Sequence, residues 1–98
     1  MAKRYLLIDD CRNLSVDVIA RNYFEGIKQL ELNGPWDELL LDHDLGSYMN
    51  DKEYTGYDIM CWLESNPQYL PGRIVCVSSN PVGVDRINQV INKLYKGE

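Results

Sequence analysis

Three short apolar runs in this chain each end abruptly in polar or acidic residues. The runs and their endings are Tyr5–Ile8 before Asp9-Asp10, Leu39–Leu41 before Asp42-His43-Asp44, and Ile74–Val77 before Ser78-Ser79-Asn80-Pro81. A continuous apolar run bounded by polar residues is typical of a strand that is covered on both faces, as in parallel sheets. The pattern therefore predicts three buried strands whose ends carry the polar chemistry of the chain.

The segments between these runs have the signals of helices. Asn22 with Glu25 three residues later resembles a capping box, and Thr55 with Asp58 offers a second helix start. A 3.6-residue apolar stripe over residues 84–94 predicts a last helix, residues 16–21 suit a short edge strand, and residues 46–54 suit a polar loop. Strands that alternate with helices imply a three-layer α/β fold, with a mostly parallel four-stranded sheet and about three helices.

Length and charge narrow the class of protein. The 98 residues suit one domain spanning residues 1–98, and ten basic against fifteen acidic side chains give a net charge of -5. This acidic balance argues against duplex DNA as a partner, because phosphate backbones are bound by basic surfaces. No apolar run is long enough for a membrane span, and three cysteines in or beside apolar runs suit reduced thiols in a cytoplasmic protein.

Acidic side chains should gather at one edge of the predicted sheet, because the carboxyl ends of parallel strands meet there. Asp9, Asp10, Asp42 and Asp44 would repel one another at that edge unless a cation compensates their charge. Oxygen ligands favour Mg²⁺ or Mn²⁺, so we expect Asp9, Asp10 and Asp42 to hold such a metal. The alternative is that these acids cap loops and face solvent.

A loop that leads into the last helix offers an anion site. Backbone N–H groups of such a loop, together with the helix N-terminus, bind phosphate. The candidate phosphate ligands are Ser78, Ser79, Asn80, Gly83, Arg86 and Arg12. The alternatives are an ordinary helix cap with a solvated Arg86, and an Arg12 that neutralises Asp10. His43 and Asp44 are candidates for general acid or base, although a packed or solvent-facing histidine is equally consistent with the sequence.

Four blocks of the chain resemble the cyclic-phosphate-processing receiver domain family. Leu-Ile-Asp-Asp-Cys-Arg at 7–12 resembles its L-D-D-x-R opening, and Leu-Asp-His-Asp-Leu-Gly at 41–46 matches its L-D-H-D-L-G block. Thr-Gly-Tyr-Asp at 55–58 and Ser-Ser-Asn-Pro-Val-Gly at 78–83 match its T-G-Y-D and S-x-N-P-x-G blocks. The resemblance covers nearly the whole chain in the same order.

The resemblance implies a shortened relative of response-regulator receivers, with a flavodoxin-like sheet in the order 2-1-3-4. It implies metal-dependent hydrolysis of a cyclic phosphate on a nucleotide or an RNA end. By receiver-like correspondence Asp9 and Asp10 are the Mg²⁺ acids, Asp42 stands at the phosphoacceptor position, and Ser78 is the small hydroxyl residue. The catalytic set is then Asp42, His43 and Asp44, with a small phosphorylated ligand as partner. The size of the chain and the setting of the family suit a phage protein.

Two departures keep other functions open. Val77 stands where the family usually has histidine before the serine, and no strand with a lysine follows the last helix pattern. The first departure favours a non-catalytic module that binds a phosphorylated nucleotide as a sensor or a sponge. The second argues against an aspartyl-phosphate signalling receiver, because in receivers that lysine contacts the phosphoryl group.

Overall fold

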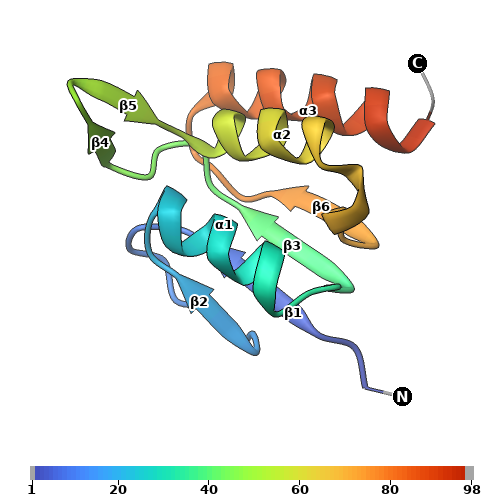
Figure 1. Ribbon diagram of the computed structural model, residues 1–98. Coiled ribbons are helices and arrows are strands. Elements are labelled where there is room, and N and C mark those ends of the chain that lie inside the picture. Colours follow the sequence, from blue (N-terminus) through green and yellow to red (C-terminus); the bar gives the residue numbers. More distant parts are fainter. Residues whose placement is uncertain (1, 97–98) are drawn as a thin grey trace.

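The computed structural model describes residues 2–96, which form a parallel four-stranded sheet with three helices (Figure 1). The sheet has the order β2-β1-β3-β6, with β1 at Tyr5–Ile8, β2 at Val18–Ala20, β3 at Glu38–Leu41 and β6 at Arg73–Cys76. The helices are α1 (Tyr23–Leu32), α2 (Gly56–Ser65) and α3 (Pro81–Lys96). The predicted receiver-like α/β fold and its strand order are thus confirmed. Met1 and residues 97–98 of the predicted domain lie outside the described residues.

Parallel pairing aligns the strands so that their carboxyl ends share one edge. Leu7 of β1 lies opposite Ile19 of β2 and Leu40 of β3, and Leu40 lies opposite Val75 of β6. β2 is an edge strand, as its short alternating sequence predicted. β1 and β3 are therefore the central pair, and the acids that follow them are neighbours.

The core lies between one face of the sheet and the helices. Strand side chains alternate between faces, and those on the helix side belong to the same buried cluster as the inward residues of all three helices. The largest fully buried members of this cluster are Leu6, Ile8, Leu30, Leu39, Leu41, Leu45, Ile59, Met60, Leu63 and Ile87. Burying such a side chain contributes about 1.5–3 kcal/mol, so this cluster dominates the stability of the domain.

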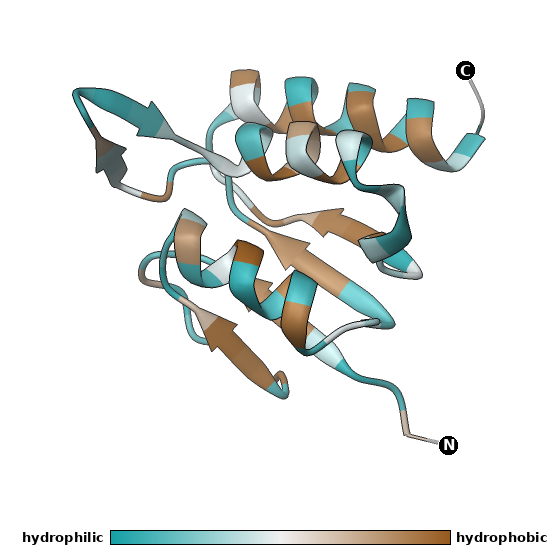
Figure 2. Ribbon diagram, in the orientation of Figure 1, coloured by the Kyte–Doolittle hydropathy of each residue, from teal (hydrophilic) through white to brown (hydrophobic). Residues whose placement is uncertain are grey.

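All three helices pack on the same side of the sheet (Figures 1 and 2). The connections from β2 to β3 and from β3 to β6 step through the sheet in one direction, and right-handed crossovers place both helices on one face. The link from β1 to β2 steps the other way, but residues 9–17 contain no helix. The second helix layer of the expected three-layer arrangement is therefore not supplied by residues 2–96, and Ile19, Leu40 and Val75 line a helix-free face.

Both predicted helix starts are confirmed. The Asn22 side chain accepts the N–H of Glu25 at 2.9 Å, and Thr55 forms a complete capping box with Asp58. Each cap satisfies a backbone N–H that the first helical turn cannot pair internally. The Thr55 cap also fixes where α2 begins. This matters for the site, because Gly56, the first residue of α2, lies against the backbone of Asp42.

Residues 46–54 form a β-hairpin where the sequence predicted a loop. β4 (Ser47–Met49) pairs antiparallel with β5 (Lys52–Tyr54) in a small sheet of its own. The turn residues Asn50 and Asp51 have φ values of 52° and 65°, the left-handed conformation that two-residue hairpins prefer at both positions. No glycine marks this turn in the sequence, so the usual hairpin signal was missing. A short 3-10 helix, η1 (Pro67–Tyr69), follows α2.

Within residues 2–96 no helix is both long and apolar enough to cross a bilayer. Cys11, Cys61 and Cys76 are free thiols, as their odd number and their positions in or beside apolar runs suggested.

Candidate functional site

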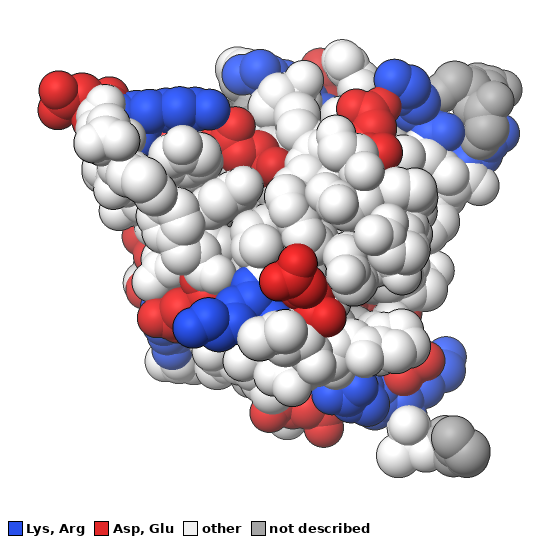
Figure 3. All heavy atoms as spheres, viewed as in Figure 1, with Lys and Arg blue, Asp and Glu red and all other residues white. Residues whose placement is uncertain are grey.

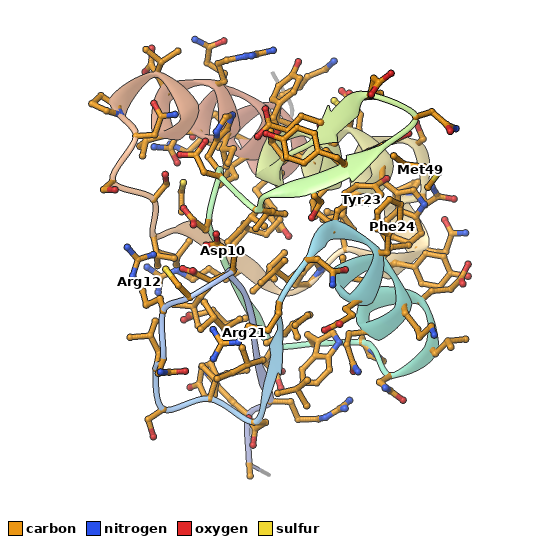
Figure 4. The ribbon with its side chains drawn as sticks, turned by 90° about the vertical axis from the view of Figure 1, so that its left-hand side faces the viewer. Asp10, Arg12, Arg21, Tyr23, Phe24 and Met49 are labelled. Atoms are coloured by element: carbon orange, nitrogen blue, oxygen red, sulfur yellow. The ribbon has the colours of Figure 1, made fainter. Side chains whose placement is uncertain are left out.

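The ends of β1, β3 and β6 meet at one edge of the sheet, which faces the viewer in Figure 4. Hydrogen bonds continue the strand pairing beyond the strands: Asp42 N donates to Ile8 O at 3.0 Å, and Val77 N donates to Leu41 O at 2.9 Å. The residues after these three strands are therefore held side by side by the backbone. Their side chains define the candidate site.

Asp9 is the most buried acid of the site, with a fully buried side chain. Its Oδ1 accepts the backbone N–H groups of Cys11 at 3.0 Å and Arg12 at 2.9 Å, and its Oδ2 accepts Arg12 Nη1 at 2.6 Å. Arg12 thus neutralises Asp9, and not Asp10 as one interpretation of the sequence had it. A carboxylate has about four acceptor positions, so three hydrogen bonds leave Asp9 with one.

Asp10 is exposed at this edge (Figure 4), and it forms a cluster with Asp9 and Cys11. One ligand atom from each of the three residues lies within 4.8 Å of the others. The pKa of the exposed Cys11 thiol is raised, mainly by the charge of Asp10, so the thiolate form is disfavoured. The cluster therefore offers carboxylate oxygens, which suit a hard divalent cation better than they suit zinc.

Asp42 is the second buried acid, with only 8% of its surface exposed. Burial raises the pKa of its carboxyl, and the charge of Asp9 raises it further. The Ser78 hydroxyl, the His43 N–H at 2.9 Å and Arg12 act in the opposite direction without cancelling the rise. Asp42 therefore carries a charge that its surroundings compensate incompletely, which is where an added cation would gain most.

His43 lies between the acid Asp44 and the start of α3. Its Nδ1 is 3.0 Å from Asp44 Oδ1, and its side chain is 12% exposed against 58% for Asp44. The ring packs directly on Gly83, where a Cβ would collide with the imidazole. The absence of a side chain at Gly83 thus leaves room for the imidazole ring of His43. The ring is packed in place, with its Nδ1 directed to the Asp44 carboxylate.

Asn80 connects this pair to α3. Its Nδ2 donates to Asp44 Oδ2 at 3.3 Å, its Oδ1 accepts the Gly83 N–H at 3.2 Å, and its own N–H donates to Ser78 Oγ at 3.0 Å. Asn80 is therefore the N-cap of α3, with Pro81 at the first helical position. The Gly83 N–H, which the sequence suggested as an anion donor, is occupied by this cap.

Replacing Asn80 with alanine should lower the free energy of unfolding by about 1 kcal/mol, because the first turn of α3 loses its cap. Urea denaturation followed by circular dichroism measures the loss. Ser79→Ala, at the exposed neighbouring position, is the matched control and should change stability by less than about 0.5 kcal/mol. Equal stability of the two variants would contradict the capping role.

Among the described residues, two predicted phosphate ligands, Ser79 and Arg86, make no hydrogen bond or ion pair with the acids of the site. The exposed Arg86 guanidinium of α3 stacks over the half-buried Tyr57 ring of α2, 4.2 Å from its centroid. Ser79 is exposed at the tip of the loop before α3. The structure therefore brings together Asp9, Asp10, Arg12, Asp42, His43, Asp44, Ser78, Asn80 and Gly83.

Arg21 is a residue of this edge that the sequence did not single out. It follows β2, and its guanidinium donates to Arg12 O at 2.9 Å, to Asp9 O at 3.4 Å and to the Asn13 side chain. These contacts tie the segment that carries the acids to the edge strand (Figure 4). No spacing rule points to such a contact, because it joins a side chain to backbone carbonyls of another loop.

No curated protein and no solved structure matches this chain. The model of the cyclic-phosphate processing receiver domain family matches residues 4–93, which include all four strands of the main sheet and nearly all of α3. The match covers well over half of the chain and every residue gathered at the acidic edge. The chain therefore belongs to the cyclic-phosphate processing receiver domain family.

Proposed function

We propose that this domain hydrolyses a cyclic phosphate on a nucleotide or an RNA end with the help of Mg²⁺ or Mn²⁺. The observation that carries the proposal is the buried Asp42 carboxylate, whose charge is compensated incompletely between Asp9 and Ser78. Its place at the carboxyl edge of a parallel sheet is where such folds bind ligands. In hydrolysis, water opens the cyclic diester and leaves a monoester with a free hydroxyl group.

The metal ligands in this proposal are Asp9, Asp10 and Asp42. All three supply oxygen. Asp9 and Asp10 lie within one cluster with Cys11, and the charge of Asp9 acts on the Asp42 carboxyl from the neighbouring strand. A divalent cation there would polarise a phosphoryl oxygen and favour an attacking water. The cation would also neutralise Asp9 in place of Arg12. Arg12 would then be free to contact the phosphate.

His43 and Asp44 are the proposed acid–base pair. The Nδ1 contact to Asp44 orients the ring and favours one tautomer, which leaves Nε2 for the proton of the water or of the leaving oxygen. Packing on Gly83 restricts ring rotation, so the histidine needs little reorganisation before it acts. The Ser78 hydroxyl, next to Asp42, is a neutral donor for the phosphate.

Removal of the metal is the direct test. The purified protein with Mg²⁺ should convert a nucleoside 2′,3′-cyclic phosphate to a monophosphate, and excess chelator should reduce the rate to background. Chromatography and mass spectrometry of the product measure the conversion. Restoring Mg²⁺ after chelation is the control and should recover the rate. Turnover that survives chelation would contradict the metal-dependent reaction.

A binding module without catalysis is the second candidate, favoured by Val77 at the family's histidine position. In that case a nucleotide should stabilise the protein against heat and be recovered uncleaved. An aspartyl-phosphate receiver is the third, and incubation with a small phosphodonor and Mg²⁺ would then add one phosphoryl mass. We expect no such addition, because among residues 2–96 the lysines that form ion pairs, Lys52 and Lys93, pair with Asp58 and Glu64 and not with the acids of the site.

Surface charge supports a small ligand over a long duplex. On the face drawn in Figure 3, Lys and Arg are dispersed among acids and form no continuous stripe. Duplex binding relies on many phosphate contacts from clustered cations. We propose a cytoplasmic location on the strength of the three free thiols.

A further inference from the structure

The hairpin of β4 and β5 is attached to the acidic edge at both of its ends. A Cβ placed at Gly46, just before β4, would lie 3.8 Å from Asp10 Oδ2. After β5, Gly56 N donates to His43 O at 2.8 Å. Figures 1 and 4 show the hairpin projecting from this edge beside the start of α1. A ligand held at the acids therefore lies next to the hairpin.

Packing against α1 makes the hairpin a firm support. Ser47 is buried and its Oγ accepts the Tyr23 N–H at 3.0 Å. The Tyr54 ring lies 4.8 Å from the ring centroid of Tyr23 and 5.4 Å from that of Phe24. Aromatic contacts at these separations are favourable, so Tyr54 is a structural residue and its face is already used.

Tyr48 is the other tyrosine of the hairpin, and it has no such role. Successive side chains of a strand point to opposite faces, so Tyr48 projects from the face opposite to Ser47, away from α1. It is 66% exposed, which is far more than a ring that contributes to the core. Two residues of chain span at most about 7 Å, so Tyr48 is rooted close to Gly46 and the Asp10 carboxylate.

The charge around Tyr48 selects the part of a ligand that fits there. Its cross-strand partner is Glu53, directly opposite in the pairing of β4 with β5. A carboxylate at this position repels phosphate and accepts hydrogen bonds from amino or hydroxyl groups. An aromatic face beside an acceptor suits an uncharged base, while the phosphate is left to the acidic edge and its cation.

We propose that Tyr48 stacks on the nucleobase of the substrate, so that the domain acts on nucleoside cyclic phosphates in preference to cyclic phosphates without a base. This inference rests on the proposed function, because it assumes that the cyclic phosphate is held at Asp9, Asp10 and Asp42. Stacking of one base on an aromatic ring corresponds to about a tenfold gain in affinity.

The test compares two substrates and four proteins. Wild-type kcat/KM should be about tenfold higher for a nucleoside 2′,3′-cyclic phosphate than for ribose 2′,3′-cyclic phosphate without a base. Tyr48→Ala should remove this preference and leave the rate on the base-free substrate unchanged. Tyr48→Phe keeps the ring and should retain the preference, as should Met49→Ala, whose exposed side chain lies on the opposite face.

The outcomes separate this inference from the proposed function. Equal wild-type kcat/KM for the two substrates, or an equal loss on both in Tyr48→Ala, would overturn base stacking while hydrolysis stands. If no cyclic phosphate is cleaved, calorimetric binding of a nucleoside 2′-monophosphate and of ribose 2′-phosphate replaces the rates. Tighter binding of the nucleotide that disappears in Tyr48→Ala would support stacking without catalysis. Equal affinities, or no binding of either, would overturn it.

Discussion

Replacing Asp42 with asparagine should lower kcat/KM for a nucleoside 2′,3′-cyclic phosphate by about 10³-fold or more. The amide keeps the shape of the side chain and one acceptor oxygen for the His43 N–H, but it loses the negative charge that would hold a cation. The same substitution should make the metal-free protein more stable at pH 7 by about 1 kcal/mol, because a desolvated charge is removed. Product formation and urea denaturation in chelator measure the two effects.

The pH dependence of this gain follows from the direction of the pKa shift. Burial raises the folded-state pKa of Asp42 above that of the unfolded chain, so the folded protein binds the proton more tightly. The stability from this group is present at low pH and is lost as pH rises through the folded-state pKa. The asparagine variant should therefore equal the wild type below the unfolded pKa of 3.8 and exceed it at neutral pH.

Asp85→Asn is the matched control, because Asp85 is an exposed acid on α3. It should leave kcat/KM almost unchanged, and it should change the free energy of unfolding by less than about 0.5 kcal/mol. An Asp42→Asn protein that turns over substrate at the wild-type rate would exclude Asp42 from the reaction. An Asp42→Asn protein that is less stable than wild type in chelator at pH 7 would show that the carboxylate is adequately compensated.

Replacing Gly56 with alanine should lower the free energy of unfolding by about 3 kcal/mol. A Cβ at this position would overlap the carbonyl oxygen of Asp42, a backbone atom that cannot move aside as the end of a side chain does. The close approach exists because α2 begins against the loop after β3. For a domain of this size the melting midpoint should fall by more than about 10 °C, which calorimetry measures.

Ser65→Ala, at the exposed end of the same helix, controls for the presence of alanine in α2 and should leave the midpoint almost unchanged. A Gly56→Ala protein with the wild-type midpoint would show that the loop after β3 can shift freely. Such freedom would also weaken the proposal for His43, whose carbonyl accepts the Gly56 N–H.

Local signals made most of the fold predictable. Buried runs such as Leu39–Leu41 and caps such as Asn22 and Thr55 act within a few residues, so their patterns are visible in the chain. Strand order followed from the family resemblance. The hairpin of residues 47–54 was missed because its turn, Asn50-Asp51, adopts left-handed backbone without the glycine that usually announces it.

The position of the candidate site could be predicted from the sequence, but the ion pairs and contacts within it could not. Parallel strands that end in acids put Asp9 and Asp42 at one edge whatever the side chains do next. Which positively charged side chain pairs with Asp9 depends on differences of a few ångströms in how closely Arg12 and other side chains approach it. Arg86 illustrates the difference, because its stacking on Tyr57 depends on the packing of α3 against α2.

Periodicity and strand endings in the sequence alone thus determined a parallel α/β sheet with its acids gathered at one edge. Only the tertiary structure decided that Arg12 neutralises Asp9, that Gly83 makes room for the His43 ring, and that the helices cover one face of the sheet. The physical reason is range. Propensity and hydrophobic pattern act between neighbours along the chain, whereas pairing and packing depend on distances between segments that are far apart in the sequence.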